Sequence, residues 1–443
     1  MGFTAYSYDG NLYSNSGSSW AMASPQTEGA DRVHSAIAAR HHDRIAAGMG
    51  NPISYTDIDH YDLLQAYQRC TAVTDGIIPY AVQEGEAMIS IRQFTILTTI
   101  FTFATSILVI PSPLAQVVGQ DAWIAAIVGI AFNLLYIMIY IGLLKRNPRQ
   151  SLIQMIDSIV GKWLGKVISL SYIFLFFSLT VYFIRYIGSF VSATILPETP
   201  TDVIYVSFTL VVIVAVRLGV ETFARAAELF FPFIVVFLAI TMLLLLPEIK
   251  LDRIEPMLES DILPLVSAGI QISTLQEHMC LLMLLAFIQQ PKRIPQSILT
   301  GTVIGSVLLI GLTALCILVL GNDYTARNLF PSYVLAKKIS IADFFERIEV
   351  LLTLVWFLAV FIKTTVSFYS TAYGMSQMLG MKSWKPITLP IGLLVVVFAK
   401  EVYANVTAYL VFIPKVWFSY GLFAFLVLPL LLLLLSLFRT RQA

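Results

Sequence analysis

Long apolar runs separated by short polar stretches repeat along the chain from about residue 90 to its end. Each run comes close to the roughly 20 apolar residues that an α-helix needs to cross a bilayer. The pattern predicts ten membrane-spanning helices, over residues 92–118, 122–144, 167–193, 203–217, 226–246, 263–289, 295–320, 347–375, 386–400 and 414–438. The sequence therefore predicts an all-α integral membrane protein.

The loops predict an orientation. Most loop lysines and arginines fall on one side if both termini are cytoplasmic, as the positive-inside rule requires. Segments 151–166 and 331–347 combine aromatic residues with lysines, which suits the headgroup boundary. We expect each to form an interfacial helix, with an ordinary connecting loop as the alternative.

Composition supports a membrane protein and narrows its partners. Charged residues make up 12% of the chain and hydrophobic residues 58%, whereas soluble domains carry roughly 25% charged residues. The net charge of +1 provides no field that would recruit nucleic acid. The cysteines Cys70, Cys280 and Cys316 have neither metal-ligand nor disulfide spacing. We expect the lipid bilayer, and no nucleic acid, as a partner.

Residues 1–87 differ from the remainder. They hold four of the five histidines, are rich in Ser, Gly and Asn, and contain no apolar run long enough to span a bilayer. We expect a polar extension, largely disordered, beside a ten-helix transmembrane domain over 88–443. The start-like context of Met88 supports a second hypothesis, that translation begins there.

The first and sixth predicted spans are interrupted. Pro111 and Pro113 remove two backbone donors from within the first, and the small polar stretch 267–274 softens the sixth. Free backbone groups at membrane depth persist only where they face protein, water or a ligand. Paired interruptions that open each half of a five-plus-five arrangement indicate a binding site near the bilayer midplane. A proline that merely kinks a span is the alternative.

Polar residues form stripes on two other spans. Ser178, Tyr182, Arg185 and Ser189 share one face of the third span. Glu349, Trp356, Lys363 and Ser370 follow one another at steps of seven on the eighth, with Ser367 nearby. We expect Arg185, near the outer end of its span, to reach partly outward.

Glu277 and Lys363 are the acid and base deepest in the second half. An ionisable side chain at such depth rarely faces lipid and needs a partner. We predict that the two pair with each other, either as part of a ligand site or as a structural pair. Gly301 and Gly305, at a small-xxx-small spacing, are assigned to helix packing.

No P-loop, Gly-x-Ser-x-Gly motif or His/Cys ligand set occurs in the sequence, and His278 is the only histidine in the predicted spans. We therefore expect no enzyme, no cofactor and no metal site. The candidate ligand-binding residues lie at the two interruptions and on the two stripes: Thr105, Ser106, Ile107, Tyr182, Ser273, Thr274, Glu277, Lys363 and Ser367.

Several motifs in continuous order over about 88–440 resemble one known family. They are Ile110-Pro111-Ser112-Pro113 followed by Asp121-Ala122-Trp123, Gly161-Lys162-Trp163-Leu164-Gly165, Gly219-Val220-Glu221-Thr222-Phe223-Ala224-Arg225, and Phe344-Phe345-Glu346-Arg347-Ile348-Glu349 leading to Trp356 and Phe361-Ile362-Lys363. This set resembles the spore germination permeases, the integral-membrane B subunits of Ger-type nutrient receptors.

The resemblance implies membership of the amino-acid–polyamine–organocation superfamily, with its five-plus-five inverted-repeat (LeuT-like) fold and broken helices one and six. It also implies a nutrient ligand, typically an amino acid, bound at the breaks, with A and C receptor subunits as partners in the inner membrane of a bacterial spore. One segment departs from the pattern. Where superfamily transporters usually carry Gly-[Ser/Thr]-Gly-Ile, this chain has Ala104-Thr105-Ser106-Ile107, which argues against the usual amino-acid pose.

Three functions are compatible with these features. The leading one is a receptor subunit in which ligand binding shifts an equilibrium between two packings. The alternative is a proton-coupled amino-acid transporter that uses the same pocket. A scaffold subunit with a vestigial pocket is the third.

Overall fold

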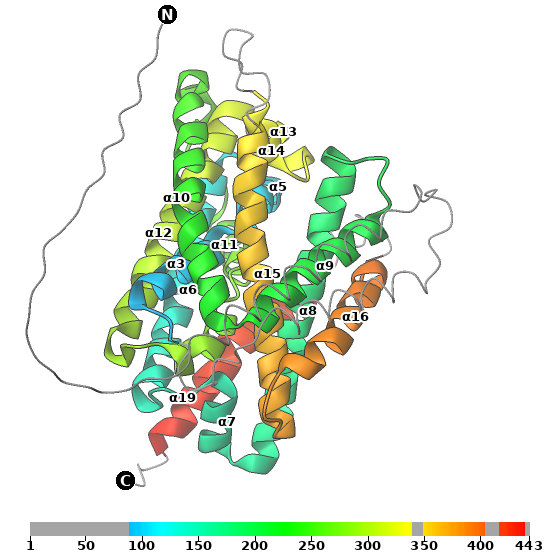
Figure 1. Ribbon diagram of the computed structural model, residues 1–443. Coiled ribbons are helices and arrows are strands. Elements are labelled where there is room, and N and C mark those ends of the chain that lie inside the picture. The colour runs from blue at the N-terminus through cyan, green and yellow to red at the C-terminus, as the bar shows by residue number, and fades with distance from the viewer. Residues whose placement is uncertain (1–87, 339–348, 404–415, 439–443) are drawn as a thin grey trace, which may run out of the picture. The chain divides into compact units, whose positions relative to one another are not determined.

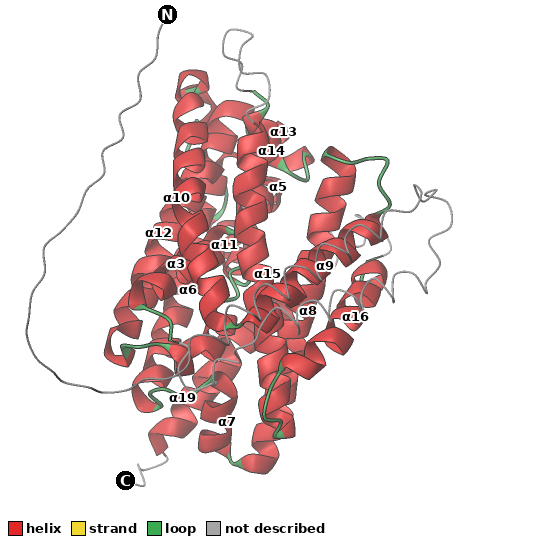
Figure 2. Cartoon of the chain, in the orientation of Figure 1, coloured by secondary structure: helices red, strands yellow, loops and turns green. Residues whose placement is uncertain are grey.

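The computed structural model describes residues 88–338, 349–403 and 416–438. The chain divides into two compact units, Met1–Pro79 and Tyr80–Ala443, and all described residues belong to the second. The predictions for residues 1–87 therefore lie outside the described part, as do those for 339–348. Figure 2 shows that the described residues are almost wholly helical and contain no strand.

Nine helices in the described ranges are long and apolar enough to cross a membrane. The ninth predicted span, 386–400, is α16 (Lys385–Glu401), whose 17 residues make it slightly shorter than those nine. The other long helices are α6 (Ala122–Arg146), α8 (Lys162–Thr194), α9 (Thr201–Leu218), α10 (Val220–Leu244), α12 (Ile294–Leu315) and α15 (Glu349–Leu379), labelled in Figure 1. The last span consists of α18 (Phe418–Leu422), a π-helical turn Phe423–Val427 and α19 (Leu428–Phe438).

The first predicted span is broken at Ala104–Thr105, beside the predicted ligand residues and upstream of the two prolines. Helix α3 (Ile91–Phe103) ends at Ala104, and a short helix, α4 (Ser106–Val109), follows Thr105. Pro111 opens a third helix, α5 (Pro111–Val118). A proline at the first position of a helix is tolerated because that N–H has no intrahelical partner. The prolines therefore start a helix, and the interruption lies upstream of them.

The sixth span is broken further along than the sequence indicated. Helix α11 (Ile262–Ser273) is regular through the stretch 267–274 almost to its end. The chain then leaves the helix over Thr274–Glu277 and continues as a 3₁₀ helix, His278–Phe287. Glu277 has a left-handed backbone conformation (φ 38°), which few non-glycine residues adopt. This conformation sets the direction in which the second half of the span leaves the break.

The structure corrects part of the prediction that two segments form interfacial helices. Segment 151–166 forms α7 (Leu152–Val160), but Lys162 to Lys166 already belong to α8. In segment 331–347 the described helix is α14 (Pro331–Ala336), and most of its side chains are buried. The Ser332 hydroxyl donates to the Ile107 carbonyl (2.6 Å), so α14 packs into the bundle beside α4.

The predicted glycine pair, Gly301 and Gly305, lies where α12 packs against α3. A Cβ on Gly301 would lie 2.7 Å from the Thr95 carbonyl oxygen, and one on Gly305 would lie 2.6 Å from Thr102 Cβ. Only glycine permits this approach of α12 to α3. The assignment of both glycines to helix packing is confirmed, and the contact joins the first helix of one half to the second half (Figure 1).

Candidate functional site

A pocket opens between the two breaks and α8. Its walls come from Thr105 and Ser106 at the first break, Leu275 and Glu277 at the second, Tyr182, Phe183 and Tyr186 of α8, and Tyr403 and Trp417 from the last third of the chain. The empty space measures about 520 Å³, part of it open to the surroundings. A mainly apolar lining with a few polar groups is typical of small-molecule sites.

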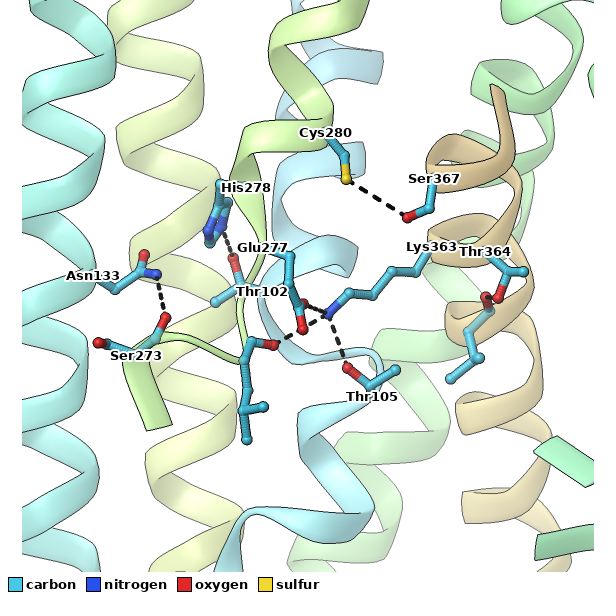
Figure 3. Close-up of polar contacts among 12 residues, drawn as sticks. Thr102, Thr105, Asn133, Ser273, Glu277, His278, Cys280, Lys363, Thr364 and Ser367 are labelled. Carbon is cyan, nitrogen blue, oxygen red and sulfur yellow. Dashed lines mark hydrogen bonds and ion pairs between the residues drawn. The ribbon is translucent and has the colours of Figure 1, made fainter. Parts of the chain in front are cut away.

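Lys363 and Glu277 form the predicted ion pair. The Lys363 Nζ atom lies 2.6 Å from Glu277 Oε2, and the two side chains are 0% and 4% exposed. Two charges so fully removed from water are stabilised only when paired and hydrogen-bonded. Glu277 lines the pocket, whereas Lys363 approaches the pair from α15 (Figure 3).

The Lys363 ammonium also contacts both breaks. It donates to Thr105 Oγ1 (2.9 Å) at the first break and to the Leu275 carbonyl (3.4 Å) at the second. The rings of Phe101 and Phe183 lie within 5.2 Å of the same atom, at distances suited to cation–π attraction. One side chain of the eighth span therefore joins both broken helices.

Aromatic rings form the opposite wall. Tyr182 stacks on Tyr403, with ring centroids 5.7 Å apart, and meets Trp417 edge-on at 5.4 Å. Such pairs hold their rings in fixed orientations and add to the energy of area burial. The wall is thus preformed and mainly apolar, while the polar groups gather at the breaks.

Two polar atoms of the lining have no partner among the described residues. They are Ser106 Oγ and Trp417 Nε1, and both side chains are at least nine-tenths buried. A buried donor without an acceptor costs roughly 1–3 kcal/mol. The indole N–H can only donate, so a bound molecule that satisfies it must present an acceptor.

Arg185 contacts residues near the ends of two neighbouring helices, α9 and α16, and its partial reach toward the outer side stays a prediction. Its guanidinium donates to the Tyr205 hydroxyl (2.9 Å) and to the carbonyls of Lys400 (3.3 Å) and Tyr403 (3.1 Å). An arginine at the end of a helix satisfies carbonyls that have no intrahelical partner. Arg185 therefore holds the end of α16 and the backbone of Tyr403 in the pocket wall.

Four of the nine predicted site residues line this pocket: Thr105, Ser106, Tyr182 and Glu277. Lys363 stands directly behind Glu277. Ile107 is buried beside α14, and Ser367 donates to Cys280 Sγ (3.7 Å). For these residues a role in ligand binding stays a prediction.

Ser273 and Thr274 face away from the pocket lining. The Tyr136 hydroxyl and Ser273 Oγ lie 2.8 Å apart, and the Asn133 amide reaches the Ser273 carbonyl at 3.5 Å. Thr274 is buried where it lies 3.0 Å from the position that a Cβ on Gly421 would take. The Ser273 hydroxyl thus contacts the neighbouring α6, whereas the Thr274 hydroxyl donates to the Gln271 carbonyl of α11 itself (2.7 Å); the predicted ligand role of both stays untested.

A second group of buried polar side chains surrounds the sixth-span break. His278 Nε2 lies 2.9 Å from Thr102 Oγ1 (Figure 3), and its Nδ1 has no partner among the described residues. The fully buried Gln276 amide likewise lacks a described partner. Buried polar groups therefore flank the sixth-span break in addition to Glu277, which lines the pocket.

Two aromatic residues of the pocket, Tyr403 and Trp417, were not among the residues predicted from the sequence. Tyr403 follows the ninth predicted span and Trp417 begins the tenth, so each resembled an ordinary membrane-interface aromatic. Only the contact of both rings with Tyr182 reveals their role in the pocket.

Comparison with known proteins identifies relatives over most of the chain. Residues 88–407 match the family described as "Spore germination protein". "Spore germination protein KB" of Bacillus subtilis (strain 168) is 27% identical, with 73% of this chain and 88% of the relative aligned. "Spore germination protein YndE" of the same organism is 26% identical over 80% and 97% of the two chains.

Solved structures share the fold at low sequence identity. MhsT in complex with L-phenylalanine superposes with a TM-score of 0.57 at 12% identity, covering 78% of this chain and 97% of that one. The nucleobase-cation-symport-1 family transporter Mhp1 gives 0.53 at 10% identity, covering 81% and 96%. The predicted LeuT-like fold is thereby confirmed. With its candidate spans, the chain is a multi-pass membrane protein.

Proposed function

The chain belongs to the spore germination protein family, and on that premise we propose that it is the membrane subunit of a nutrient germinant receptor that binds a small nutrient between its two broken helices. The observation that carries this proposal is the position of Glu277, which lines the pocket and pairs with the lysine that joins both breaks. A molecule that reaches Glu277 therefore reaches the contact between the two halves.

The polar groups of the pocket define the ligand chemistry. The Glu277 carboxylate accepts hydrogen bonds, so it suits an ammonium or another donor. Ser106 and Trp417 offer donors that need an acceptor. A zwitterionic amino acid carries both kinds of group, and the aromatic wall accommodates its side chain. Residues 104 and 106 are Ala and Ser rather than glycine, so side chains, rather than bare amides, would meet the ligand carboxylate.

Ligand binding would act on the Lys363 contacts. A donor that bonds to Glu277 competes with the Lys363 ammonium for the same carboxylate. Weakening this contact loosens the link from α15 to Thr105 and Leu275. A ligand shifts an equilibrium between two packings only by its differential affinity for them, and this competition provides such a difference.

The A and C receptor subunits are the proposed partners that read the shift, in the inner membrane of the spore. A proton-coupled transporter is the second candidate, favoured by the fold and by a carboxylate in the pocket that could carry a proton. No reaction chemistry is required for either function.

Binding and flux measurements on the purified protein in liposomes test the proposal. Trp417→Phe removes the indole N–H but keeps most of the ring, and it should weaken binding of an active amino acid about five- to 150-fold, which corresponds to about 1–3 kcal/mol. Trp356→Phe is the matched control, because its buried Nε1 also lacks a described partner but does not line the pocket.

The outcomes separate the candidates. Saturable binding without net flux supports the receptor subunit, and flux that follows a proton gradient supports the transporter. If the wild type and Trp417→Phe bind the amino acid with equal affinity, the proposed hydrogen bond from the Trp417 indole N–H to the ligand is wrong. No binding of any amino acid that triggers germination would leave only the scaffold function.

A further inference from the structure

A second pocket lies where α6 ends and α12 begins. Its lining residues come from other parts of the sequence than those of the first pocket. It is lined by Leu144, Lys145, Pro148, Arg149, Pro291, Lys292, Ile294 and Pro295, and its empty space measures about 690 Å³, part of it open. Three of these eight residues are basic and none is acidic. Positively charged groups thus gather on one concave surface.

The three basic side chains have no acidic partner among the described residues. Neither Lys145, Arg149 nor Lys292 takes part in any described ion pair or side-chain hydrogen bond. Arg146, the direct neighbour of Lys145, is instead engaged with the Ser436 carbonyl of α19 at 3.1 Å. The three residues are exposed, so solvent and salt screen their mutual repulsion, and an anion between them would relieve what remains of it.

The position of the pocket limits the anion. Both α6 and α12 are candidate membrane spans, so their adjoining ends mark a membrane boundary. The lysine and arginine distribution assigns this boundary to the cytoplasmic side. The other walls, Leu144, Ile294 and the three prolines, are apolar. Basic side chains beside apolar walls match a phosphate headgroup attached to a glycerol and acyl chains.

We propose that this pocket binds an anionic phospholipid of the cytoplasmic leaflet, with the lipid phosphate between Lys145, Arg149 and Lys292. The bound lipid would connect α6, in the first half of the fold, to α12, in the second half. The site does not depend on the proposed nutrient pocket, since the two linings have no residue in common.

The test compares lipid retention between variants of the full chain. The protein is reconstituted in bilayers of phosphatidylcholine that contain a minor fraction of phosphatidylglycerol. Native mass spectrometry then counts the phosphatidylglycerol molecules that stay bound to the protein. Neutralising one basic residue should lower the relative affinity for phosphatidylglycerol about five-fold, at roughly 1 kcal/mol per basic group. Lys145→Gln/Arg149→Gln/Lys292→Gln should therefore abolish preferential retention.

Matched variants keep the result specific. Lys382→Gln/Lys385→Gln removes two basic residues from another loop on the predicted cytoplasmic side, outside the pocket lining, and should retain phosphatidylglycerol like the wild type. Lys145→Arg/Lys292→Arg keeps the charge and should also retain it. If the triple variant fails to insert, the single variants supply the same comparison.

Three results would overturn the proposal. The first is an equal preference for phosphatidylglycerol in the wild type and the pocket variants. The second is an equal loss in the Lys382/Lys385 control, which would indicate a diffuse surface effect. The third is displacement of the lipid by millimolar inorganic phosphate or glycerol phosphate, which would identify a site for soluble phosphate instead.

Discussion

The Lys363 ammonium lies 2.6 Å from the Glu277 carboxylate, and the contact joins the eighth span to the break in the sixth. Removing one partner leaves a buried charge alone, which typically costs about 3–5 kcal/mol. Glu277→Gln and Lys363→Met should each lower thermal stability and impair the nutrient response. The double variant should be milder than the sum of the two, as measured in a double-mutant cycle. Strictly additive effects would refute the coupling.

Enlarging Ser106 should fill the pocket at the first break. We expect Ser106→Leu to weaken the response to nutrient at least ten-fold with unchanged protein levels, because the side chain occupies ligand space. Ser169→Leu is a control, since Ser169 is equally buried on α8 but lies outside the pocket lining. A dose-response curve that stays unchanged for Ser106→Leu would contradict this placement.

Thr274 was expected at the ligand as well, but an enlarged side chain there has a different effect in the structure. Thr274→Leu would press on Gly421 and the last span before it could reach the pocket. We therefore expect loss of thermal stability by about 1–3 kcal/mol, as in overpacked cores, together with the weaker response. A variant with native stability and a weakened response would instead place Thr274 at the ligand.

Replacing the packing glycines of α12 should separate it from α3. A methyl group on Gly301 would meet the Thr95 carbonyl at 2.7 Å, so Gly301→Ala should destabilise the fold by about 1–3 kcal/mol. Gly311→Ala is the control on the same helix, because its methyl group would meet only the flexible end of Met242. Thermal unfolding in detergent measures both, and equal stabilities would argue against the packing role.

Removal of residues 1–87 should leave the membrane fold intact. The described residues that follow Met88 are already tied into the fold: the Ile89 N–H donates to the Phe287 carbonyl (2.8 Å), and Ser90 caps α3. A chain that begins at Met88 should insert and respond to nutrient like the full chain. Loss of both insertion and response would show that the extension is required.

The positions of the breaks show where sequence reasoning reached its limit. Prolines and a small polar stretch indicated that spans one and six were interrupted, and both are. The interruptions lie at Ala104–Thr105, upstream of the prolines, and at Thr274–Glu277, where the polar stretch ends. Pro111 can start a helix as readily as end one, so its local effect depends on the neighbours that satisfy the adjoining backbone groups.

The sequence by itself determined the membrane class, the order of the spans and the Glu277–Lys363 pair. Span length follows from the apolar run that crosses the bilayer, and the cost of a deep charge requires a partner wherever that partner lies. Tertiary structure alone decided which neighbour each polar face meets. The rotation of each helix brought Tyr403 and Trp417 to Tyr182, turned Ser273 toward Tyr136, and placed Arg185 on the end of α16. A spacing along one helix fixes a shared face but not the direction in which that face points.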